Sequence, residues 1–343
     1  MSILKKTLSC VVLAALGTCA LAGCGRQDTS NEATTSASPE ASAAITETVS
    51  ESIAASEQTP APDAPGIQSA GPADVTSTPF GQHGALHVEN GKLTDADGNI
   101  VQLYGMSTHG IAWFPQYINY DSFRTLRDDW NTNCIRLAMY TAEYGGYCAG
   151  GDKEQLKQLV RDGVSYATEL GMYVIVDWHI LSDCDPNQNK DEAIAFFREM
   201  SEAFADNDNV LYEICNEPNS GTSWDSIKSY AEEVIPVIRE QKPDAVILVG
   251  TPTWSQEIDK AAASPLTFDN VMYTLHFYAG THKDDLRNRL ETCAQNNLPV
   301  FVSEFGMCDA SGNGANDFDS TTKWLDLLNK YQISFCCWNL ANK

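Results

Sequence analysis

The chain has 343 residues, 43% of them hydrophobic and 20% charged, so it can bury at least one large hydrophobic core. Its 46 acidic and 22 basic side chains give a formal net charge of −24. This charge argues against nucleic acid, an anionic lipid surface or a polyanionic polysaccharide as a partner, and a neutral substrate is the simpler expectation.

Residues 1–23 have the pattern of a bacterial lipoprotein signal peptide. Lys5 and Lys6 precede an apolar run, residues 8–21, which is too short to span a membrane comfortably. The run ends in Leu-Ala-Gly-Cys, which resembles a lipobox with Cys24 as the lipid-modified first residue of the mature protein. A signal peptide without lipidation is the alternative. We therefore expect an extracellular protein that is either secreted or attached to the cell surface through a lipid on Cys24.

Residues 24–79 are predicted to be a disordered acidic tether. The segment is rich in Ser, Thr, Ala, Glu and Pro, and no Lys or Arg occurs between Arg26 and Lys92. Such a composition offers too little apolar surface to offset the entropy lost on ordering. The tether would hold a single domain, residues 80–343, clear of the membrane.

The domain is predicted to begin with a small hairpin over residues 85–101, and it continues as strands that alternate with helices. Runs rich in β-branched and aromatic residues predict strands at 101–106, 134–140, 173–179, 210–216, 245–250, 271–278, 299–304 and 334–338. The clearest amphipathic segments predict helices at 153–170, 191–204, 224–241, 284–296 and 317–331. Eight strands separated by helices indicate an α/β fold with a parallel sheet, and eight is the number that closes a (β/α)8 TIM barrel.

The cysteines give no sign of a metal site. Eight of the eleven lie beyond Cys24, and none of these forms a C-x-x-C pair that would suggest zinc. Several sit in apolar runs and are interpreted as buried small hydrophobes. Cys148 and Cys184 lie in polar surroundings, and a disulfide between them is one interpretation.

Polar side chains gather at the C-terminal ends of the predicted strands, where barrels of this class build their sites. One apolar strand runs into Asn216-Glu217-Pro218, and another ends in Glu304. Asn216 and Glu217 are adjacent, so the strand must bulge or end between them if both are to face one cleft. The other strand ends contribute His109, Arg136, Tyr140, Asp177, His179, Trp254, His276, Tyr278 and Trp338.

Two carboxylates in an aromatic-rich cleft, without the spacing of metal ligands, fit glycoside hydrolysis with no cofactor and no metal. Arg136 near one carboxylate would hold it ionised, while the other keeps its proton. Trp113, Trp178, Trp254 and Trp338 would supply flat faces on which sugar rings stack. Taken singly, each tryptophan is as readily explained as a core residue, and each histidine as a structural one. The combination at the strand ends favours a site.

Eight segments resemble glycoside hydrolase family 5, in particular its bacterial endo-β-1,4-glucanases (cellulases). They are GMSTHGIAWF, IRLAMY, YVIVDWHIL, LYEICNEPN, GTPTWSQ, LHFYAGTH, FVSEFG and CCWNL, and they run in order from about residue 101 to the end of the chain. The resemblance implies a (β/α)8 barrel and retention of anomeric configuration by double displacement.

The resemblance also implies a role for each matching residue. Glu217 would be the acid/base and Glu304 the nucleophile, with their carboxyls about 5 to 5.5 Å apart and the higher pKa on Glu217. Arg136 and Tyr278 would hydrogen-bond the nucleophile, and Asn216 would contact the sugar 2-hydroxyl. His179 and His276 would line the reacting subsite, and the positions implied to bind glucose units are His109, Trp113, Tyr140, Trp254, Trp338 and Lys343.

The family continues past its eighth strand into a final helix, whereas this sequence ends at Lys343. We therefore expect a barrel that lacks its final helix, with apolar surface uncovered beside the first and eighth strands.

Three other functions stay open at this point. The protein could be a related β-glycanase acting on mannan, xyloglucan or mixed-linkage glucan, because loops decide specificity. It could be a truncated surface glycan-binding protein, or a metal-dependent barrel such as a sugar isomerase. The interpretation favoured by the sequence is a monomeric endo-glucanase that acts on a neutral β-glucan.

Overall fold

The structure is a computed structural model that describes residues 75–341. The predicted signal peptide, Cys24, most of the predicted tether and Lys343 lie outside the described residues. The described chain begins with a short 3-10 helix, Val75–Ser77, and Thr78 then caps helix α1 (Pro79–His83). A hairpin follows, in which β1 (His87–Glu89) pairs antiparallel with β2 (Lys92–Thr94). The predicted N-terminal hairpin is therefore present.

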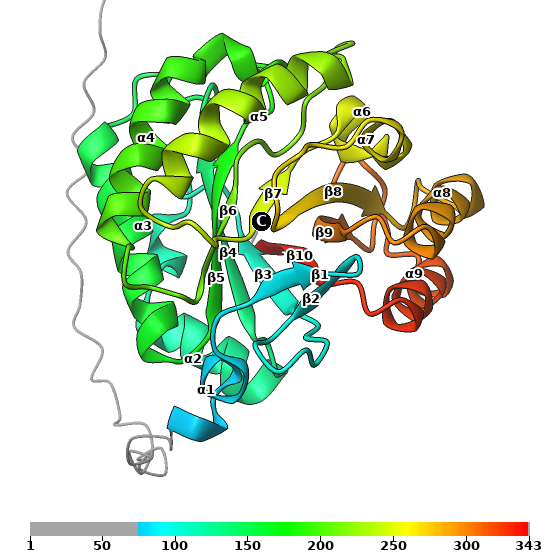
Figure 1. Cartoon of the computed structure of the whole chain (residues 1–343), viewed down its shortest axis with the longest axis horizontal. Coiled ribbons are helices and arrows are strands. Elements are labelled where there is room, and N and C mark those ends of the chain that lie inside the picture. Colours follow the sequence, from blue (N-terminus) through cyan, green and yellow to red (C-terminus); the bar gives the residue numbers. More distant parts are fainter. Residues whose placement is uncertain (1–74, 342–343) are drawn as a thin grey trace, which may run out of the picture. The chain divides into compact units, whose positions relative to one another are not determined.

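Eight parallel strands close into a barrel in the order β10-β3-β4-β5-β6-β7-β8-β9, which confirms the predicted TIM-barrel class (Figure 1). The predicted bounds are correct for three of them and differ by a few residues for the others. The strands are β3 (Tyr104–Thr108), β4 (Cys134–Tyr140), β5 (Tyr173–His179), β6 (Val210–Glu213), β7 (Ile247–Val249), β8 (Val271–Tyr278), β9 (Val300–Gly306) and β10 (Phe335–Leu340).

Helices connect successive strands on the outside of the barrel (Figure 1). All five predicted helices are present, and α2, α6 and α7 are additional. The helices are α2 (Tyr120–Trp130), α3 (Lys153–Glu169), α4 (Lys190–Ala203), α5 (Trp224–Arg239), α6 (Pro252–Ser255), α7 (Ile258–Ala263), α8 (Asp284–Gln295) and α9 (Phe318–Lys330), with 3-10 turns at Pro115–Tyr117 and Pro186–Asn189. Among residues 75–341, none of the helices combines the length and apolar character that a bilayer span requires.

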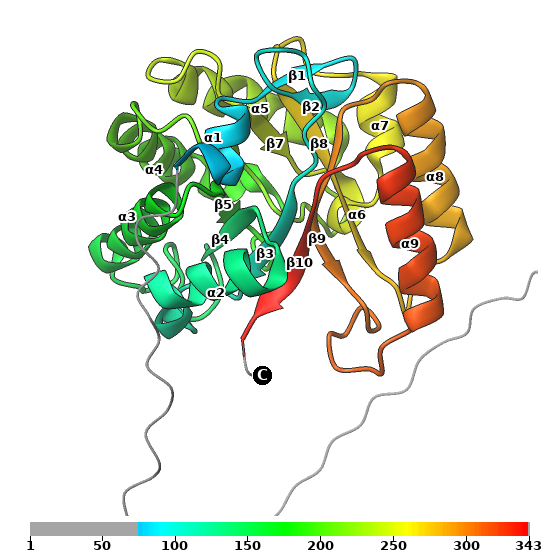
Figure 2. The same cartoon turned by 90° about the horizontal axis from the view of Figure 1, so that it is seen from below.

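The last strand, β10, lies between β3 and β9, and no helix follows it within the described residues (Figure 2). Tyr104 on β3 is 42% exposed, and its ring packs edge-on against Phe335 of β10 at 5.3 Å between ring centres. Apolar surface is therefore accessible beside these two strands.

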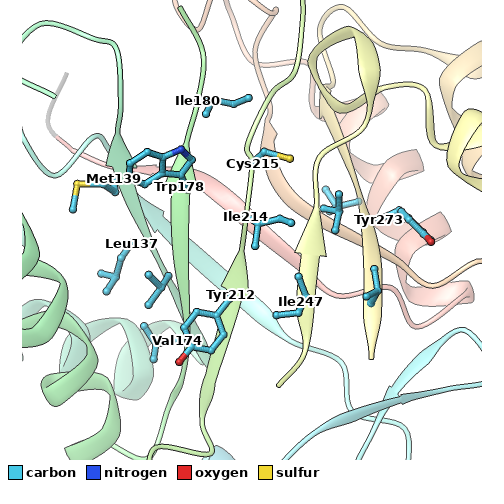
Figure 3. Packing of buried hydrophobic residues seen from close by; sticks show 14 of the residues in the cluster. Leu137, Met139, Val174, Trp178, Ile180, Tyr212, Ile214, Cys215, Ile247 and Tyr273 are labelled. Carbon is cyan, nitrogen blue, oxygen red and sulfur yellow. The ribbon is translucent and has the colours of Figure 1, made fainter. Parts of the chain in front are cut away.

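Side chains alternate between the two faces of each strand, and this separates two hydrophobic clusters. The larger cluster fills the layer between strands and helices, and the smaller one closes the inside of the barrel. Trp178 is fully buried in the outer cluster (Figure 3). Its ring centre lies 5.2 Å from that of Phe196. The expectation that Trp178 offers a face to sugar is wrong, because its neighbours Asp177 and His179 occupy the inner face of β5.

All eight cysteines in the described part of the chain are free. The interpretation of Cys148 and Cys184 as a disulfide is therefore wrong. The thiol of Cys184 instead lies 3.3 Å from the hydroxyl of Ser220.

Candidate active site

The inner face of the barrel carries polar residues above its apolar floor. Arg136 on β4, Asp177 on β5 and Glu213 on β6 are all fully buried. Strand β6 ends at Glu213, and the chain then crosses toward β5. The amide of Asn216 donates to Trp178 O at 3.2 Å, and that of Glu217 donates to Ile180 O at 3.3 Å. Because β6 ends early, Asn216 and Glu217 can both reach the site although they are adjacent in the sequence.

The guanidinium of Arg136 connects the buried carboxylates. Its Nε donates to Glu213 at 2.8 Å, and its Nη1 donates to Glu304 at 3.3 Å. Its Nη2 lies 3.0 Å from Asp177 Oδ2 and 2.6 Å from Asn216 Oδ1. One cation thus faces three carboxyl groups. Their attraction offsets the free energy that the guanidinium loses on leaving water.

Glu217 and Glu304 lie side by side at the mouth of the barrel. The two side chains each present a carboxylate oxygen, and these oxygens lie within 4.8 Å of one another. Glu304 accepts from Arg136 and, at 2.7 Å, from the hydroxyl of Tyr278. Glu217 contacts Nδ1 of His276 at 2.9 Å. Two donors on Glu304 favour its ionised form, whereas Glu217 has a neutral partner.

Burial dominates the electrostatics of the pair. It raises the pKa of Glu217 to about 8, against the opposing effect of the Arg136 charge. Burial and the nearby Glu217 also raise the pKa of Glu304, while the charge of Arg136 acts to lower it. Two carboxyls this close cannot both ionise freely, because the charge on either one raises the pKa of the other.

The two histidines are neutral near pH 7, because burial lowers the pKa of His276 to about 4 and that of His179 to about 3. Nδ1 of His179 lies 2.7 Å from Asp177 Oδ2, and its Nε2 lies 3.2 Å from the amide nitrogen of Asn216. Burial also raises the pKa of Asp177 to about 7.

A cleft of about 700 Å³ opens above the pair. Most predicted site residues line it, namely His109, Trp113, Tyr140, His179, Glu217, Trp254, His276, Tyr278, Glu304 and Trp338. Arg136 and Asn216 lie fully buried outside the lining, and Lys343 lies outside the described residues. Trp338 stacks on His179, with 5.1 Å between ring centres.

Several lining residues were not predicted from the sequence. They lie on loops that carried no periodic signal, and they include Glu143, Gln256, His282 and the turn of residues 310–313. Below the cleft, Glu213 and Ser303 were also missed. Glu213 is a lone polar residue within an apolar strand, and Ser303 directly precedes the more conspicuous Glu304.

Glu217, His276 and Glu304 present ligand atoms close enough to hold a metal ion. Each group already has hydrogen-bond partners in the protein. Both ring nitrogens of His276 have partners, one on Glu217 and one on Ser303. Since a metal would have to displace these bonds, we interpret the group as an acid–base pair with its neighbours.

The amino-acid sequence is similar to those of several known proteins. The chain is 52% identical over 264 residues to endoglucanase A of Butyrivibrio fibrisolvens, covering 76% of this chain and 61% of that protein. It is 47% identical over 274 residues to an endoglucanase of Clostridium saccharobutylicum, covering 79% of this chain and 60% of the relative. The chain thus spans less than two thirds of the length of these two relatives.

Solved structures of cellulases are also similar to this chain. A cellulase named Cel5C_n superposes with a TM-score of 0.76 at 44% identity, over 78% of this chain and 84% of the other. The catalytic domain of Thermobifida fusca endoglucanase Cel5A, in complex with cellotetraose, superposes with a TM-score of 0.75 at 44% identity, over 78% and 88% of the two chains. The family model described as cellulase (glycosyl hydrolase family 5) matches residues 94–343. Because that match takes in every strand of the barrel and both strand-end glutamates, the chain belongs to the cellulase family, glycosyl hydrolase family 5.

Proposed function

We propose that this protein is an endo-acting hydrolase of β-1,4-glucosidic bonds in cellulose or related β-glucans, and that it retains anomeric configuration. The observation that carries the proposal is the approach of Glu217 and Glu304 oxygens to within 4.8 Å. Retaining glycosidases place their carboxyls about 5 to 5.5 Å apart, whereas inverting enzymes leave about 6.5 to 9.5 Å for a water molecule.

The contacts favour Glu304 as the nucleophile and Glu217 as the acid/base. Arg136 and Tyr278 keep Glu304 ionised, so that its carboxylate can attack the anomeric carbon. Glu217 holds a proton at neutral pH and gives it to the departing glycosidic oxygen. In the second step Glu217 takes a proton from the water that breaks the bond between sugar and Glu304.

The aromatic residues support a chain substrate that extends to both sides of the pair. Trp113 follows β3 and Trp254 follows β7, and these strands are four places apart in the closed order of eight. Both indoles line the cleft and are 45% exposed. Sugar-binding faces on opposite sides of the barrel suit attack on internal bonds. The endoglucanase relatives and the cellotetraose complex of a similar structure support a β-1,4-glucan.

The test is reducing-sugar release by the full chain from carboxymethylcellulose, glucomannan and barley β-glucan. We expect release from the cellulose derivative with a fast fall in viscosity, and loss of both in Glu217→Gln. That substitution keeps the shape of the side chain but removes the titratable proton. Release from glucomannan alone would favour a mannanase. A folded protein that binds these glycans but cleaves none of them would favour a glycan-binding role.

The pH dependence of kcat/KM is expected to follow the proton on Glu217. The pKa of Glu217 is raised to about 8, so the proton is present below that pH and is lost above it. Activity should therefore fall as the pH rises through about 8, with a basic limb of unit slope. Glu217→Gln should remove the limb along with the activity. A basic limb near the ordinary glutamate value would contradict the assignment of the acid.

We further propose that the protein is exported and anchored outside the cell by a lipid on Cys24. The support is the signal-like residues 1–23, which end in Leu-Ala-Gly-Cys. In a bacterial host, Cys24→Ser should move the protein from the membrane fraction to the medium. An unchanged distribution between the two fractions would refute the anchor.

A further inference from the structure

The short element α6, which follows β7 at the mouth of the barrel, is a left-handed turn. Thr253 has φ 59° and ψ 57°, Trp254 has φ 53° and ψ 50°, and Ser255 has φ 53°. Residues other than glycine avoid this region because their Cβ comes too close to the following carbonyl oxygen, and they visit it singly rather than in succession. Three successive residues in this conformation, one of them the β-branched Thr253, therefore need support from the surrounding structure.

The support comes from the hydroxyl of Ser255. It donates to Asn216 O at 2.6 Å, and it accepts from the amide of Thr251 at 3.2 Å and from the hydroxyl of Thr274 at 3.1 Å. A serine hydroxyl has one proton and two acceptor sites, so its hydrogen-bonding capacity is filled. Thr251, Ser255 and Thr274 are all fully buried. These contacts hold the end of the turn between β8 and the segment that carries Glu217.

The turn also decides where the indole of Trp254 lies. The amide of Trp254 donates to Pro218 O at 3.0 Å, and Ser255 donates to Asn216 O, so the turn is attached to the chain on both sides of Glu217. The indole lines the cleft and is 45% exposed. Because so much of the ring is exposed, its position depends on the conformation of its own backbone rather than on close packing. A right-handed turn would direct its Cα–Cβ bond elsewhere.

We propose that Ser255 and Thr274 are positioning residues for the leaving-group side of the cleft. They hold the left-handed turn, and the turn fixes the face of Trp254 that binds the departing glucose units. This inference rests on the proposed function. Glu217 gives its proton to the departing oxygen, so a sugar-binding face attached on both sides of Glu217 aligns that oxygen with the acid. Trp113, on the opposite side of the barrel, binds the part of the chain that stays.

The first measurement compares two substrates in Ser255→Ala. Cellopentaose places glucose units on both sides of the cleaved bond, whereas β-cellobiosyl fluoride has no sugar on the leaving-group side. Without the hydroxyl the turn can relax, and Trp254 loses its position. We expect kcat/KM to fall about tenfold on cellopentaose and to change less than about twofold on the fluoride, since only the first needs the turn. Equal falls on both substrates would indicate a general loss of structure and would overturn the proposal.

A glycine tests whether the left-handed conformation is the cause. The side chain of Thr253 is exposed, and glycine adopts this conformation without a Cβ clash. Thr253→Gly, added to Ser255→Ala, should therefore recover about threefold in kcat/KM on cellopentaose. The absence of any recovery would refute the role given to the turn. Ser201→Ala is the matched control, because it removes another fully buried serine hydroxyl, on α4, and should leave both substrates unaffected.

Thr274→Val is the milder variant and remains informative even if Ser255→Ala does not fold. It nearly keeps the shape of the side chain and removes one of the three hydrogen bonds of Ser255. We expect kcat/KM on cellopentaose to fall about threefold, with the fluoride again almost unaffected. Equal falls on the two substrates would contradict the proposal here as well.

The second measurement needs no turnover. In the full chain labelled with fluorotryptophan, and with Trp254→Phe used to assign the signal, Trp254 should give one narrow ¹⁹F resonance. In Ser255→Ala the resonance should broaden or split, and added Thr253→Gly should narrow it again. An identical resonance in wild type and Ser255→Ala would overturn the proposal. If the resonances behave as expected but the wild type cleaves no β-glucan, the proposed function fails while the support of the turn by Ser255 holds.

Discussion

Replacing Glu304 with alanine is expected to lower kcat on a β-glucan by about 10⁵-fold, since no other group can form the covalent intermediate. Arg136 and Tyr278, which donate to Glu304, would face an empty space of about carboxylate size. A small anion should fill that space and take over the attack. We therefore expect azide to restore cleavage of an aryl β-glycoside whose leaving group needs no acid.

The product of the rescue identifies the role of each carboxyl. In Glu304→Ala, azide attacks from the side of the missing nucleophile and should give the α-glycosyl azide. In Glu217→Ala, the covalent intermediate still forms on Glu304, and azide attacks from the opposite side to give the β-glycosyl azide. NMR of the product distinguishes the two anomers. An α product from Glu217→Ala with a β product from Glu304→Ala would reverse the assignment.

The barrel was predictable because its longest buried strands are continuous apolar runs. The predicted bounds of β4, β5 and β8 match the structure, and each of these strands has seven or eight residues. Strand β7 has only three residues, so its hydrogen-bonded pairs with β6 and β8, rather than its local sequence, decide where it ends. Helix α2 was missed because its eleven residues are mostly polar and only Phe123 and Leu126 are buried, although its few apolar side chains do recur at helical spacing.

The residues that line the cleft were more predictable than the buried polar residues beneath it. A polar residue at a strand end is visible in the sequence, and most such residues line the cleft. Glu213 was missed because its partner Arg136 is 77 residues away, so no local pattern connects the two. Trp178 was misplaced although the signal was present. Asp177 and His179 share one face of β5, so the residue between them must point to the helices.

Arg136→Met is expected to give the largest loss of stability among single substitutions at the site. The variant leaves Asp177, Glu213 and Glu304 buried without their cation. Removal of one partner from a buried ion pair costs about 3 to 5 kcal/mol. We expect the free energy of unfolding, measured by urea denaturation at pH 7, to fall by about that amount. Activity should fall as well, because Glu304 loses a donor that keeps it ionised.

The pH dependence of this loss separates lost charge pairing from lost packing. Without Arg136, the folded-state pKa values of the three carboxyls rise further above their unfolded values, so the folded state binds more protons. The deficit relative to wild type should therefore shrink as the pH is lowered from 8 to 5. Arg124→Met is the matched control, because Arg124 pairs with Asp121 on the exposed side of α2. This substitution should leave the free energy of unfolding nearly unchanged. If the loss of unfolding free energy in Arg136→Met did not depend on pH, the packing of the Arg136 side chain, rather than its charge, would be what stabilises this part of the barrel.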